Sequence, residues 1–343
     1  MRQANLIENG KVILQEAEKP TPSAGQVLIK VKYVGICGSD IHAYHGAHPY
    51  VSAPIVLGHE MSGEIVELGE NVSSLAVGDR VTIMPQVFCG ECEACVSGRY
   101  NICHTLEVIG CQTTGASSDY FAVDASLVKK MPPTMPYDVI ATIEPAAVGV
   151  HAVRRTDIKG KNVVVLGAGT IGNLTAQAAL AEGAKAVLIS DLSDYRLNLA
   201  KECGIEHIVN TTKEDLVEAM KKAFDGNTGD VFFECVGIGA TVEQAIQHSK
   251  KGHDIVIVGV FGKRVEVDFG LVQDRELRLI GTLMYLEEDY DSTLDYMVAG
   301  KIRTDKLISY TFPLESFDEA FHYIDENKET AMKVLIRIDE SEA

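Results

Sequence analysis

The sequence predicts a small β-barrel or sandwich followed by a doubly wound α/β domain. Over the first third, short apolar or alternating runs are separated by Gly, Pro and Asn, a pattern typical of closely spaced strands. From about residue 161, near-continuous apolar runs alternate with helical segments, as in a parallel sheet covered by helices. At 343 residues the chain is long enough for two domains.

The β region begins with four short runs bounded by turn residues. The segments Pro20–Pro22 and Val77–Asp79 have the composition of turns and lie where a barrel would need corners. The expected strands are Lys11–Leu14, Gln26–Val31, Gly63–Leu68 and Arg80–Met84.

Within this region, the stretch from 35 to 63 contains a candidate metal site. Cys37, His59 and Glu60 offer a thiolate, an imidazole and a carboxylate, the ligand types that zinc uses when it keeps a fourth position open. Taken singly, Cys37 would more often be a buried structural cysteine and His59 a loop residue. Ser39 and His42 add a hydroxyl and a second imidazole to the same stretch. Taken together, these residues favour a catalytic site.

Four cysteines lie within fifteen residues immediately after the β region. Disulfides are disfavoured in a reducing compartment, and the spacing is not a usual one for an iron–sulfur cluster. One loop with this spacing can surround a tetrahedral zinc ion, which would supply the folding energy that its few apolar residues cannot. We therefore predict a structural zinc lobe over about residues 86–106, with the ligands Cys89, Cys92, Cys95 and Cys103.

The segment Asp138–Val153 has helical spacing and contains Glu144 directly before Pro145. An acidic residue at this place could simply complement the dipole at a helix N-terminus. The functional alternative is that Glu144 points a carboxylate at the metal site.

The next segment has the pattern of a dinucleotide-binding βαβ unit. A strand at Asn162–Leu166 runs directly into a glycine-rich turn that opens a helix reaching about Glu182. The following strand, Val187–Ser190, ends at Asp191. Such a turn lets the backbone approach a pyrophosphate, and the acid would accept hydrogen bonds from the ribose and repel a 2′-phosphate, favouring NAD over NADP. The turn comprises Gly167, Ala168, Gly169, Thr170, Ile171 and Gly172.

Later strands and helices complete a six-stranded doubly wound sheet. The residues that follow its strands, Cys235, Val258 and Val260, lie where such sheets bind ligand, although simple turns would also place them there. The expected strands are His207–Asn210, Val231–Glu234, Asp254–Val258 and Leu277–Gly281, with helices at Lys213–Ala223 and Thr241–Ser249. After them come a helix to about Ala299, then Leu307–Pro313, the helical segment Phe317–Asn327 and a last strand, Val334–Ile338.

Composition narrows the class of protein. The net charge of −18 argues against nucleic acid or an anionic membrane as a partner. No apolar run approaches the length of a membrane span, and residues 1–5 have no secretion-signal pattern. With eight cysteines, we expect a cytoplasmic, reducing location.

Together these motifs resemble the zinc-dependent medium-chain dehydrogenases over essentially the whole chain. Within that family the chain is most similar to the polyol branch, the sorbitol (L-iditol) dehydrogenases and their relatives, through residues 144–155 and through the Asp191-Leu-Ser-x-x-Arg196 pattern. The motifs that carry the wider likeness are GICGSDIH (35–42), GHE (58–60), VGDRV (77–81), the four-cysteine lobe, EPAAVGVHA (144–152) and GAGTIG (167–172).

The resemblance implies a split GroES-like catalytic domain, residues 1–149 and 286–343, around a Rossmann domain at 150–285. Cys37, His59 and Glu60 would surround the catalytic zinc, and Glu144 would ligate it or hold its water. Each chain would then bind two zinc ions and NAD, with Arg196 at the coenzyme site. Members associate through the Rossmann sheet edge, near Leu277–Tyr285 here, and we expect a homotetramer rather than a dimer.

Two positions depart from the sorbitol dehydrogenases. They usually carry a tyrosine directly after the D-x-H motif, where this chain has Ala43 and only then Tyr44. They also carry an arginine before the residue that matches Tyr285, where this chain has Met284. The sequence therefore leaves open a different polyol, a sugar acid, a small diol or an amino alcohol such as threonine.

The expected reaction is reversible NAD-linked oxidation of a secondary alcohol to a ketone. Zinc would lower the pKa of the alcohol, and hydride would pass to the nicotinamide. Ser39 would accept the proton and His42 deliver it to solvent, unless they are a turn residue and a surface histidine. A metal-free reductase would lack Cys37 and His59, and a non-catalytic NAD-binding protein would be expected to have lost a ligand or relay residue.

Overall fold

The computed structural model describes residues 1–342 and divides into two compact units. Unit 1 comprises residues 1–144 together with the segment that starts at Ile308, and unit 2 comprises Pro145–Leu307. The domain boundaries expected from the sequence were 149/150 and 285/286. The second boundary differs because helix α10 (Glu287–Val298) belongs to unit 2, where its buried Asp289 pairs with His151 and Arg154.

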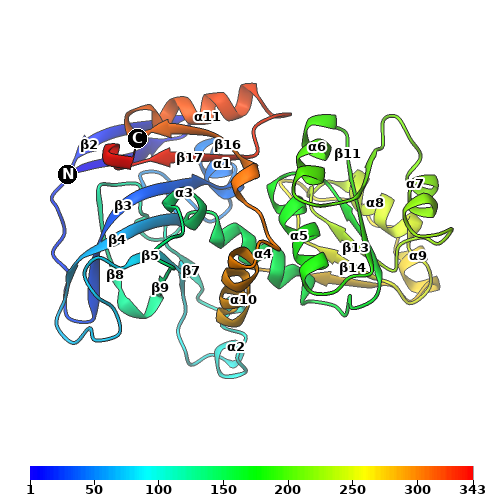
Figure 1. The fold of residues 1–343 in the computed structure, drawn as a ribbon, viewed down its shortest axis with the longest axis horizontal. Helices are drawn as coiled ribbons and strands as arrows, with labels where there is room; N and C mark the ends of the chain where they lie inside the picture. Colours follow the sequence, from blue (N-terminus) through cyan, green and yellow to red (C-terminus); the bar gives the residue numbers. More distant parts are fainter. Residues whose placement is uncertain (343) are drawn as a thin grey trace. The chain divides into compact units, whose positions relative to one another are not determined.

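Unit 1 is built on a seven-stranded sheet in which the two ends of the chain meet (Figure 1). Its long strand β3 (Gln26–Ile36) pairs antiparallel with β4 (Glu60–Leu68), β8 (Tyr120–Asp124) and the late strand β17 (Lys333–Arg337). The remaining strands are β5 (Arg80–Ile83), β9 (Val128–Lys130) and β16 (Ile308–Pro313). The predicted β region is confirmed, and β16 and β17 of its sheet come from the end of the chain, as expected for a split domain.

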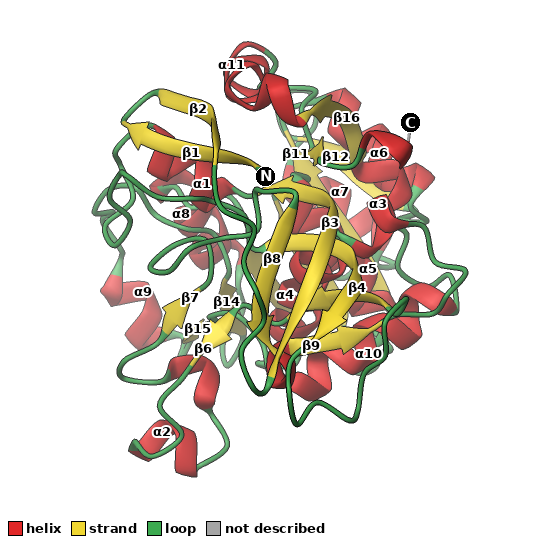
Figure 2. Ribbon diagram, turned by 90° about the vertical axis from the view of Figure 1, so that its left-hand side faces the viewer, coloured by secondary structure: helices red, strands yellow, loops and turns green. Residues whose placement is uncertain are grey.

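Smaller elements surround this sheet. The hairpin of β1 (Arg2–Glu8) and β2 (Lys11–Glu16) lies beside it (Figure 2), and β6 (Gln86–Val87) pairs with β7 (Glu107–Val108) at the base of the four-cysteine lobe. Helix α11 (Phe317–Glu326) packs against β2 and β17. The sequence does not predict strands at β1, β6, β7, β8 or β9, most of which are short or carry polar residues on both faces.

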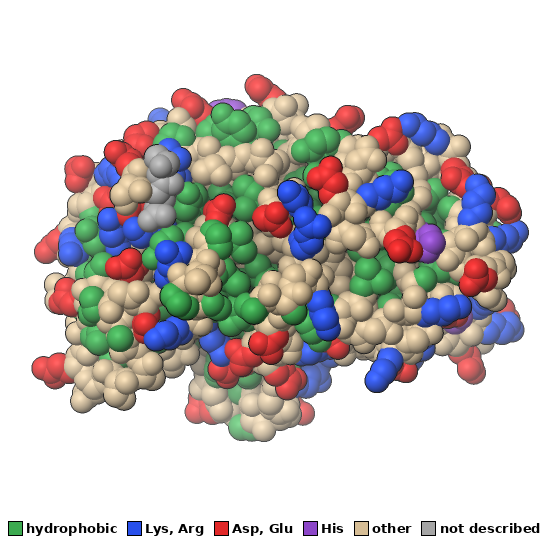
Figure 3. Space-filling view, in the orientation of Figure 1, with side chains coloured by type: hydrophobic (Ala, Val, Ile, Leu, Met, Phe, Trp, Pro, Cys, Tyr) green, Lys and Arg blue, Asp and Glu red, His purple; other side chains and the backbone are tan. Residues whose placement is uncertain are grey.

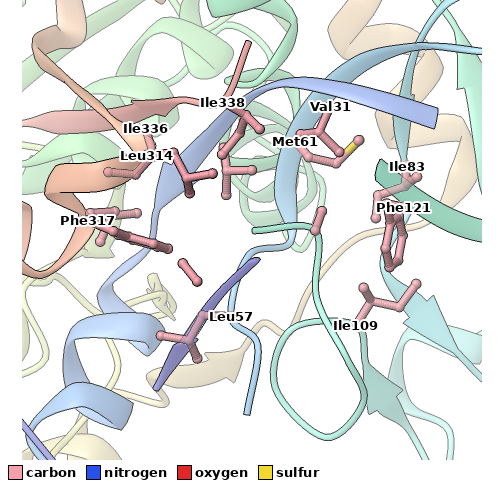
Figure 4. Close-up of a cluster of buried hydrophobic side chains, with 14 of the residues drawn as sticks. Val31, Leu57, Met61, Ile83, Ile109, Phe121, Leu314, Phe317, Ile336 and Ile338 are labelled. Atoms are coloured by element: carbon pink, nitrogen blue, oxygen red, sulfur yellow. The ribbon is translucent and has the colours of Figure 1, made fainter. Parts of the chain in front are cut away.

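The core of unit 1 joins the same distant segments. Figure 4 shows Leu314, Phe317 and Ile336 from the end of the chain in one buried cluster with Val31, Leu57 and Met61 from the beginning. These side chains are almost completely buried. Apolar burial of this kind is the main favourable term in folding, so the two ends of the chain are held in one domain by it.

Unit 2 has a parallel six-stranded sheet in the order β12-β11-β10-β13-β14-β15, which confirms the predicted doubly wound topology. Helices α5 and α6 cover one face and α7, α8 and α9 the other (Figure 1). The strands are β10 (Asn162–Leu166), β11 (Ala186–Asp191), β12 (His207–Asn210), β13 (Val231–Glu234), β14 (Asp254–Ile257) and β15 (Arg278–Gly281). The helices are α5 (Thr170–Ala181), α6 (Asp194–Glu202), α7 (Leu216–Ala223), α8 (Gly239–His248) and α9 (Phe269–Asp274).

The prediction of one helical segment at Asp138–Val153 is wrong in one respect, because the structure has two helices there. Helix α3 (Tyr137–Ile140) ends first, and α4 (Ile143–Val153) begins three residues later. Pro145 lies in the first turn of α4, where its missing N–H costs nothing, and the same ring would break a continuous helix. Glu144 is therefore at a helix start, as the sequence suggested.

The surface carries charges of both signs. On the face drawn in Figure 3, acidic and basic side chains are interspersed rather than gathered into one patch. Among the described residues, no helix combines the length and apolar character needed to cross a membrane.

Candidate active site

The candidate metal site begins where strand β3 gives way to a short helix, α1 (Gly38–Tyr44), which the sequence analysis did not predict. Cys37 is the N-cap residue of this helix, and Asp40 in its first turn accepts a hydrogen bond from the Cys37 N–H at 2.8 Å. This capping arrangement fixes the position of Cys37. Ser39 and His42 are half-buried and three residues apart on α1, so their side chains share a helix face.

His59 and Glu60 reach the same place at the start of β4. Gly35 on β3 pairs with Glu60 on β4, which brings Glu60 close to Cys37 in space. Gly58, which has a φ of 103°, lets the chain enter the strand, and a Cβ there would lie 2.8 Å from Val34 Cγ1. Ligand atoms of Cys37, His59 and Glu60 lie within 4.8 Å of one another, so the structure assembles the three residues proposed from the sequence.

Asp40 is a further site residue that was not predicted from the sequence. It is buried, and its Oδ1 lies 3.8 Å from Nδ1 of His59, and neither atom has a hydrogen-bond partner in the part of the chain that the structure describes. Burial raises the pKa of Asp40, and His59 opposes that shift. Burial alone would lower the pKa of His59, but Asp40 and the thiols of Cys111 and Cys37 raise it overall. A carboxylate behind a histidine orients the imidazole so that its other nitrogen faces a metal.

Lys333 is the second site residue that was missed, because it lies almost 300 residues after Cys37. It is buried on β17, and its Nζ donates to Glu60 Oε1 at 2.7 Å, to Glu60 Oε2 at 2.6 Å and to the Ile36 carbonyl at 3.0 Å. Burial lowers the pKa of Lys333, but Glu60 and then Cys37 raise it overall. Both oxygens of Glu60 are thus committed to an ammonium group in this structure.

Glu144 does not join this group of three. It is buried at the start of α4 and lies close enough to raise the pKa of Lys333, after Glu60 and Cys37. The sequence left the choice between Glu60 and Glu144 open. Because Lys333 bonds to both oxygens of Glu60, we favour Glu144 over Glu60 as the carboxylate that approaches a metal.

The donor set fits zinc. A half-buried thiol, a buried imidazole with an unbonded carboxylate behind it and a nearby carboxylate form an open, mixed site of the catalytic type. Cys37 and His59 would hold the ion, and Glu60 or Glu144 would either complete its set of ligands or lie beside it.

The second cluster fits a structural zinc ion, as the sequence predicted. The sulfurs of Cys89 and Cys103 are 3.5 Å apart, those of Cys92 and Cys95 are 3.5 Å apart, and all four lie within 4.8 Å of one another. A hydrogen bond from the Cys89 N–H lowers the pKa of Cys103 to about 6, so this ligand is readily available as the thiolate that zinc requires. All four positions are supplied by protein, which is the closed arrangement of a structural site.

In unit 2, the glycine-rich turn has the geometry of a dinucleotide site. Gly169 caps α5, and a Cβ on Gly172 would lie 1.8 Å from the carbonyl oxygen of Gly167. The Asp191 carboxylate accepts hydrogen bonds from the N–H groups of Ala168, Leu192 and Ser193 at 2.7–2.9 Å. Asp191 therefore ties the turn to the end of β11.

Four further residues frame this edge of the sheet. Nη1 of Arg196 lies 3.9 Å from Asp191 Oδ2, beside the turn. Cys235 follows β13 and donates to the Thr175 hydroxyl at 3.9 Å. Val260, in the loop after β14, is 72% exposed and available for contact. Val258, directly after the same strand, donates its N–H to the Glu234 carbonyl.

Glu234 is a buried residue at the end of β13, for which the sequence suggested no separate role. Its Oε1 accepts hydrogen bonds from the N–H groups of Val236 and Gly237 and from the Thr241 hydroxyl, at 2.6–2.9 Å. It thereby fixes the loop that follows β13. A buried carboxylate at the end of a central strand is the signal that could have identified it.

The structure also locates the residues that depart from the sorbitol dehydrogenase pattern. Tyr44 is buried and stacks on Phe321 with ring centroids 4.3 Å apart, and its hydroxyl donates to Asp318 at 3.3 Å. Its polar end is therefore used by helix α11. In unit 2, Met284 has a φ of 50° and precedes the fully buried Tyr285.

Comparison with known families agrees with this geometry. Residues 23–133 match the alcohol dehydrogenase GroES-like domain, and residues 170–299 match the zinc-binding dehydrogenase domain. The chain belongs to the zinc-type medium-chain alcohol dehydrogenases, as its sequence suggested. Within this family it groups with the polyol branch.

Two curated relatives of this dehydrogenase cover nearly all of it. A sorbitol dehydrogenase from Halalkalibacterium halodurans is 37% identical, with 95% of this chain and 96% of the relative aligned. An L-threonine 3-dehydrogenase from Pyrococcus furiosus is 34% identical over 90% of each chain.

Solved structures give the same fold. A 2R,3R-butanediol dehydrogenase from Bacillus subtilis has a TM-score of 0.90 at 31% identity over 98% of this chain and 99% of the other. A zinc-binding dehydrogenase from Sinorhizobium meliloti bound to NADP has a TM-score of 0.89 at 32% identity, with the same coverage. An Escherichia coli alcohol dehydrogenase complexed with NADH has a TM-score of 0.91 at 30% identity, again with that coverage.

Replacing Asp40 by Asn should weaken zinc binding at the Cys37 site by about 10- to 100-fold, because the imidazole of His59 loses the carboxylate that orients it. Metal content during titration with a chelator would measure this. Cys92→Ser provides the comparison, since it should release the other zinc ion. Unchanged zinc retention in Asp40→Asn would contradict the role given to Asp40.

Replacing Lys333 by Met should lower the free energy of unfolding of unit 1 by about 3–5 kcal/mol, because the charge of Glu60 would remain buried without its partner. Chemical denaturation of the zinc-loaded protein measures the change. The double variant Lys333→Met with Glu60→Gln removes both charges and should recover much of the loss. Failure of the second substitution to recover any stability would contradict the pairing.

Proposed function

We propose that this protein is an NAD-dependent zinc alcohol dehydrogenase that interconverts a secondary alcohol and its ketone. The convergence of Cys37, His59 and Glu60 next to the helix that carries Ser39 and His42 is the observation that carries the proposal. A metal site with one open ligand position, placed beside a hydroxyl and an imidazole, is suited to removing a proton from an alcohol.

The chain's own residues have separate tasks in this reaction. When bound, zinc supplies a Lewis acid for the substrate oxygen and the nicotinamide accepts the hydride. Ser39 accepts the hydroxyl proton of the substrate through its Oγ, and His42, on the same face of α1, passes that proton toward solvent. Asp40 holds His59 in orientation, and Lys333 balances the charge of Glu60.

NAD rather than NADP is the proposed coenzyme. Asp191 places a negative charge at the end of β11, where it would repel a 2′-phosphate. Arg196 lies 3.9 Å from that carboxylate, so part of its charge is already balanced. Solved relatives carry NADP in one case and NADH in another, which makes Asp191 the residue to test.

The proposed substrate is a polyol, a sugar alcohol or a sugar acid. The sorbitol dehydrogenase among the relatives supports this class. The alternative is a small diol or an amino alcohol, which the threonine and butanediol dehydrogenases among the relatives favour.

We also propose a cytoplasmic homotetramer with no nucleic-acid or membrane partner. Strand β15 is the last strand of its sheet, with exposed Arg278 and Gly281, so it offers hydrogen-bonding groups to a second copy. A reducing cytoplasm would keep the cysteine ligands as free thiols.

Zinc-loaded protein should reduce NAD in the presence of at least one member of a panel of polyols, sugar acids, diols and threonine. Chelation should abolish this turnover, and Cys37→Ser should lower kcat/KM well beyond the roughly 100-fold effect expected for a residue outside the metal ligands. Spectrophotometry of NADH formation provides the measurement. Turnover that survives both chelation and Cys37→Ser would refute the proposal.

Replacing Asp191 by Asn should raise the ratio of NADP to NAD activity by about tenfold, because the repulsion of a 2′-phosphate by a carboxylate is removed. The ratio of kcat/KM for the two coenzymes measures this. Asp194→Asn, an exposed change on α6, serves as the matched control. A wild-type preference for NADP would show that Asp191 does not select the coenzyme.

A further inference from the structure

The loop that follows α1 returns to the helix that carries the proton-relay residues. The N–H groups of Ala47 and His48 both donate to the carbonyl of His42, at 2.8 and 3.1 Å. These two bonds fix His48 next to His42, and its side chain is half-buried.

The His48 ring has a defined orientation and tautomer. Its Nδ1 accepts a hydrogen bond from the Tyr50 N–H at 3.2 Å, and the Tyr50 ring lies edge-on to it with centroids 6.3 Å apart. Because Nδ1 is an acceptor, the ring proton is on Nε2. Burial, followed by the imidazoles of His42 and His59, lowers the pKa of His48, in the same direction as this neutral tautomer.

The position of His48 follows from its backbone, because its N–H donates to the His42 carbonyl at 3.1 Å. His48 therefore lies beside the relay residue His42. Within residues 1–342, no protein acceptor bonds to its Nε2–H. This donor is therefore available to a molecule that enters the site.

The other polar side chains of this loop have other roles. The Tyr44 hydroxyl donates to Asp318, and His45 Nε2 lies 3.0 Å from an oxygen of Asp325. Tyr50 is 76% exposed. Among the ring-bearing residues of the loop, His48 alone combines partial burial, a fixed tautomer and a free donor.

We propose that His48 is a specificity-determining residue whose Nε2–H donates a hydrogen bond to an oxygen on the carbon adjacent to the reacting one. The inference rests on the proposed dehydrogenase function and narrows its substrate class. A neutral donor favours a neighbouring hydroxyl or carbonyl oxygen, gains nothing from a methyl group and cannot bond to an ammonium group. The preferred substrates are then vicinal diols, polyols and hydroxy acids rather than simple secondary alcohols or amino alcohols such as threonine.

A matched set of alcohols tests this directly. The compounds CH3–CHOH–CH2–X, with X as OH, CH3 or NH3⁺, are 1,2-propanediol, 2-butanol and 1-amino-2-propanol, and they differ at one group beside the same reacting carbon. The three compounds are compared with the same configuration at the reacting carbon. Among them, we expect the wild-type enzyme, loaded with zinc and NAD, to have the highest kcat/KM for the diol. His48→Ala should lower kcat/KM for the diol by about tenfold, mostly through KM, and change that for 2-butanol little, since one neutral hydrogen bond is lost.

Two further variants separate recognition from structure. His48→Gln keeps a side-chain N–H donor and should restore part of the preference for the diol. His45→Ala, on the same loop, should leave the ratio of diol to 2-butanol activity unchanged. Equal losses for diol and 2-butanol in His48→Ala, or a wild-type preference for the amino alcohol, would overturn the inference while leaving the dehydrogenase function intact. Absence of turnover with every alcohol in the wider panel would overturn the proposed function and this inference with it.

Discussion

The pairing register of three strands determines where the metal site forms. Gly35 near the end of β3 lies opposite Glu60 on one neighbouring strand and Leu335 on the other. A one-residue slip in either pair would turn the side chains of that strand to the opposite face. The register therefore brings Cys37, Glu60 and Lys333 to one end of the sheet, although they are distant in sequence. Gly35 permits this closeness, since a Cβ there would lie 2.2 Å from Glu60 Oε2.

The local sequence pattern was sufficient to predict many of the secondary-structure elements and the four-cysteine site. The strands at Asn162–Leu166, His207–Asn210 and Val231–Glu234 have the predicted bounds, because buried parallel strands are short apolar runs that end at turn residues. The four-cysteine lobe was equally legible, since its ligands come from one loop of fifteen residues.

Long-range partners could not be predicted in the same way. Lys333 has no local feature that links it to Glu60, and only the pairing of β17 with β3 brings them together. Asp40 was overlooked for a different reason. Nothing in its immediate sequence assigns it a role, and only the turn of α1 places its carboxylate behind His59.

The contribution of β17 also affects how the site is assembled during synthesis. Residues 37–60 leave the ribosome long before residue 333, and until then the carboxylate of Glu60 has no ammonium partner. Contacts so far apart in sequence form late and slow the folding of a domain. The Rossmann unit, in contrast, is one continuous segment and can fold while the first unit is still incomplete. The metal site thus acquires its full electrostatic balance only after almost the whole chain has been made, which delays catalytic competence until both ends of the chain have met.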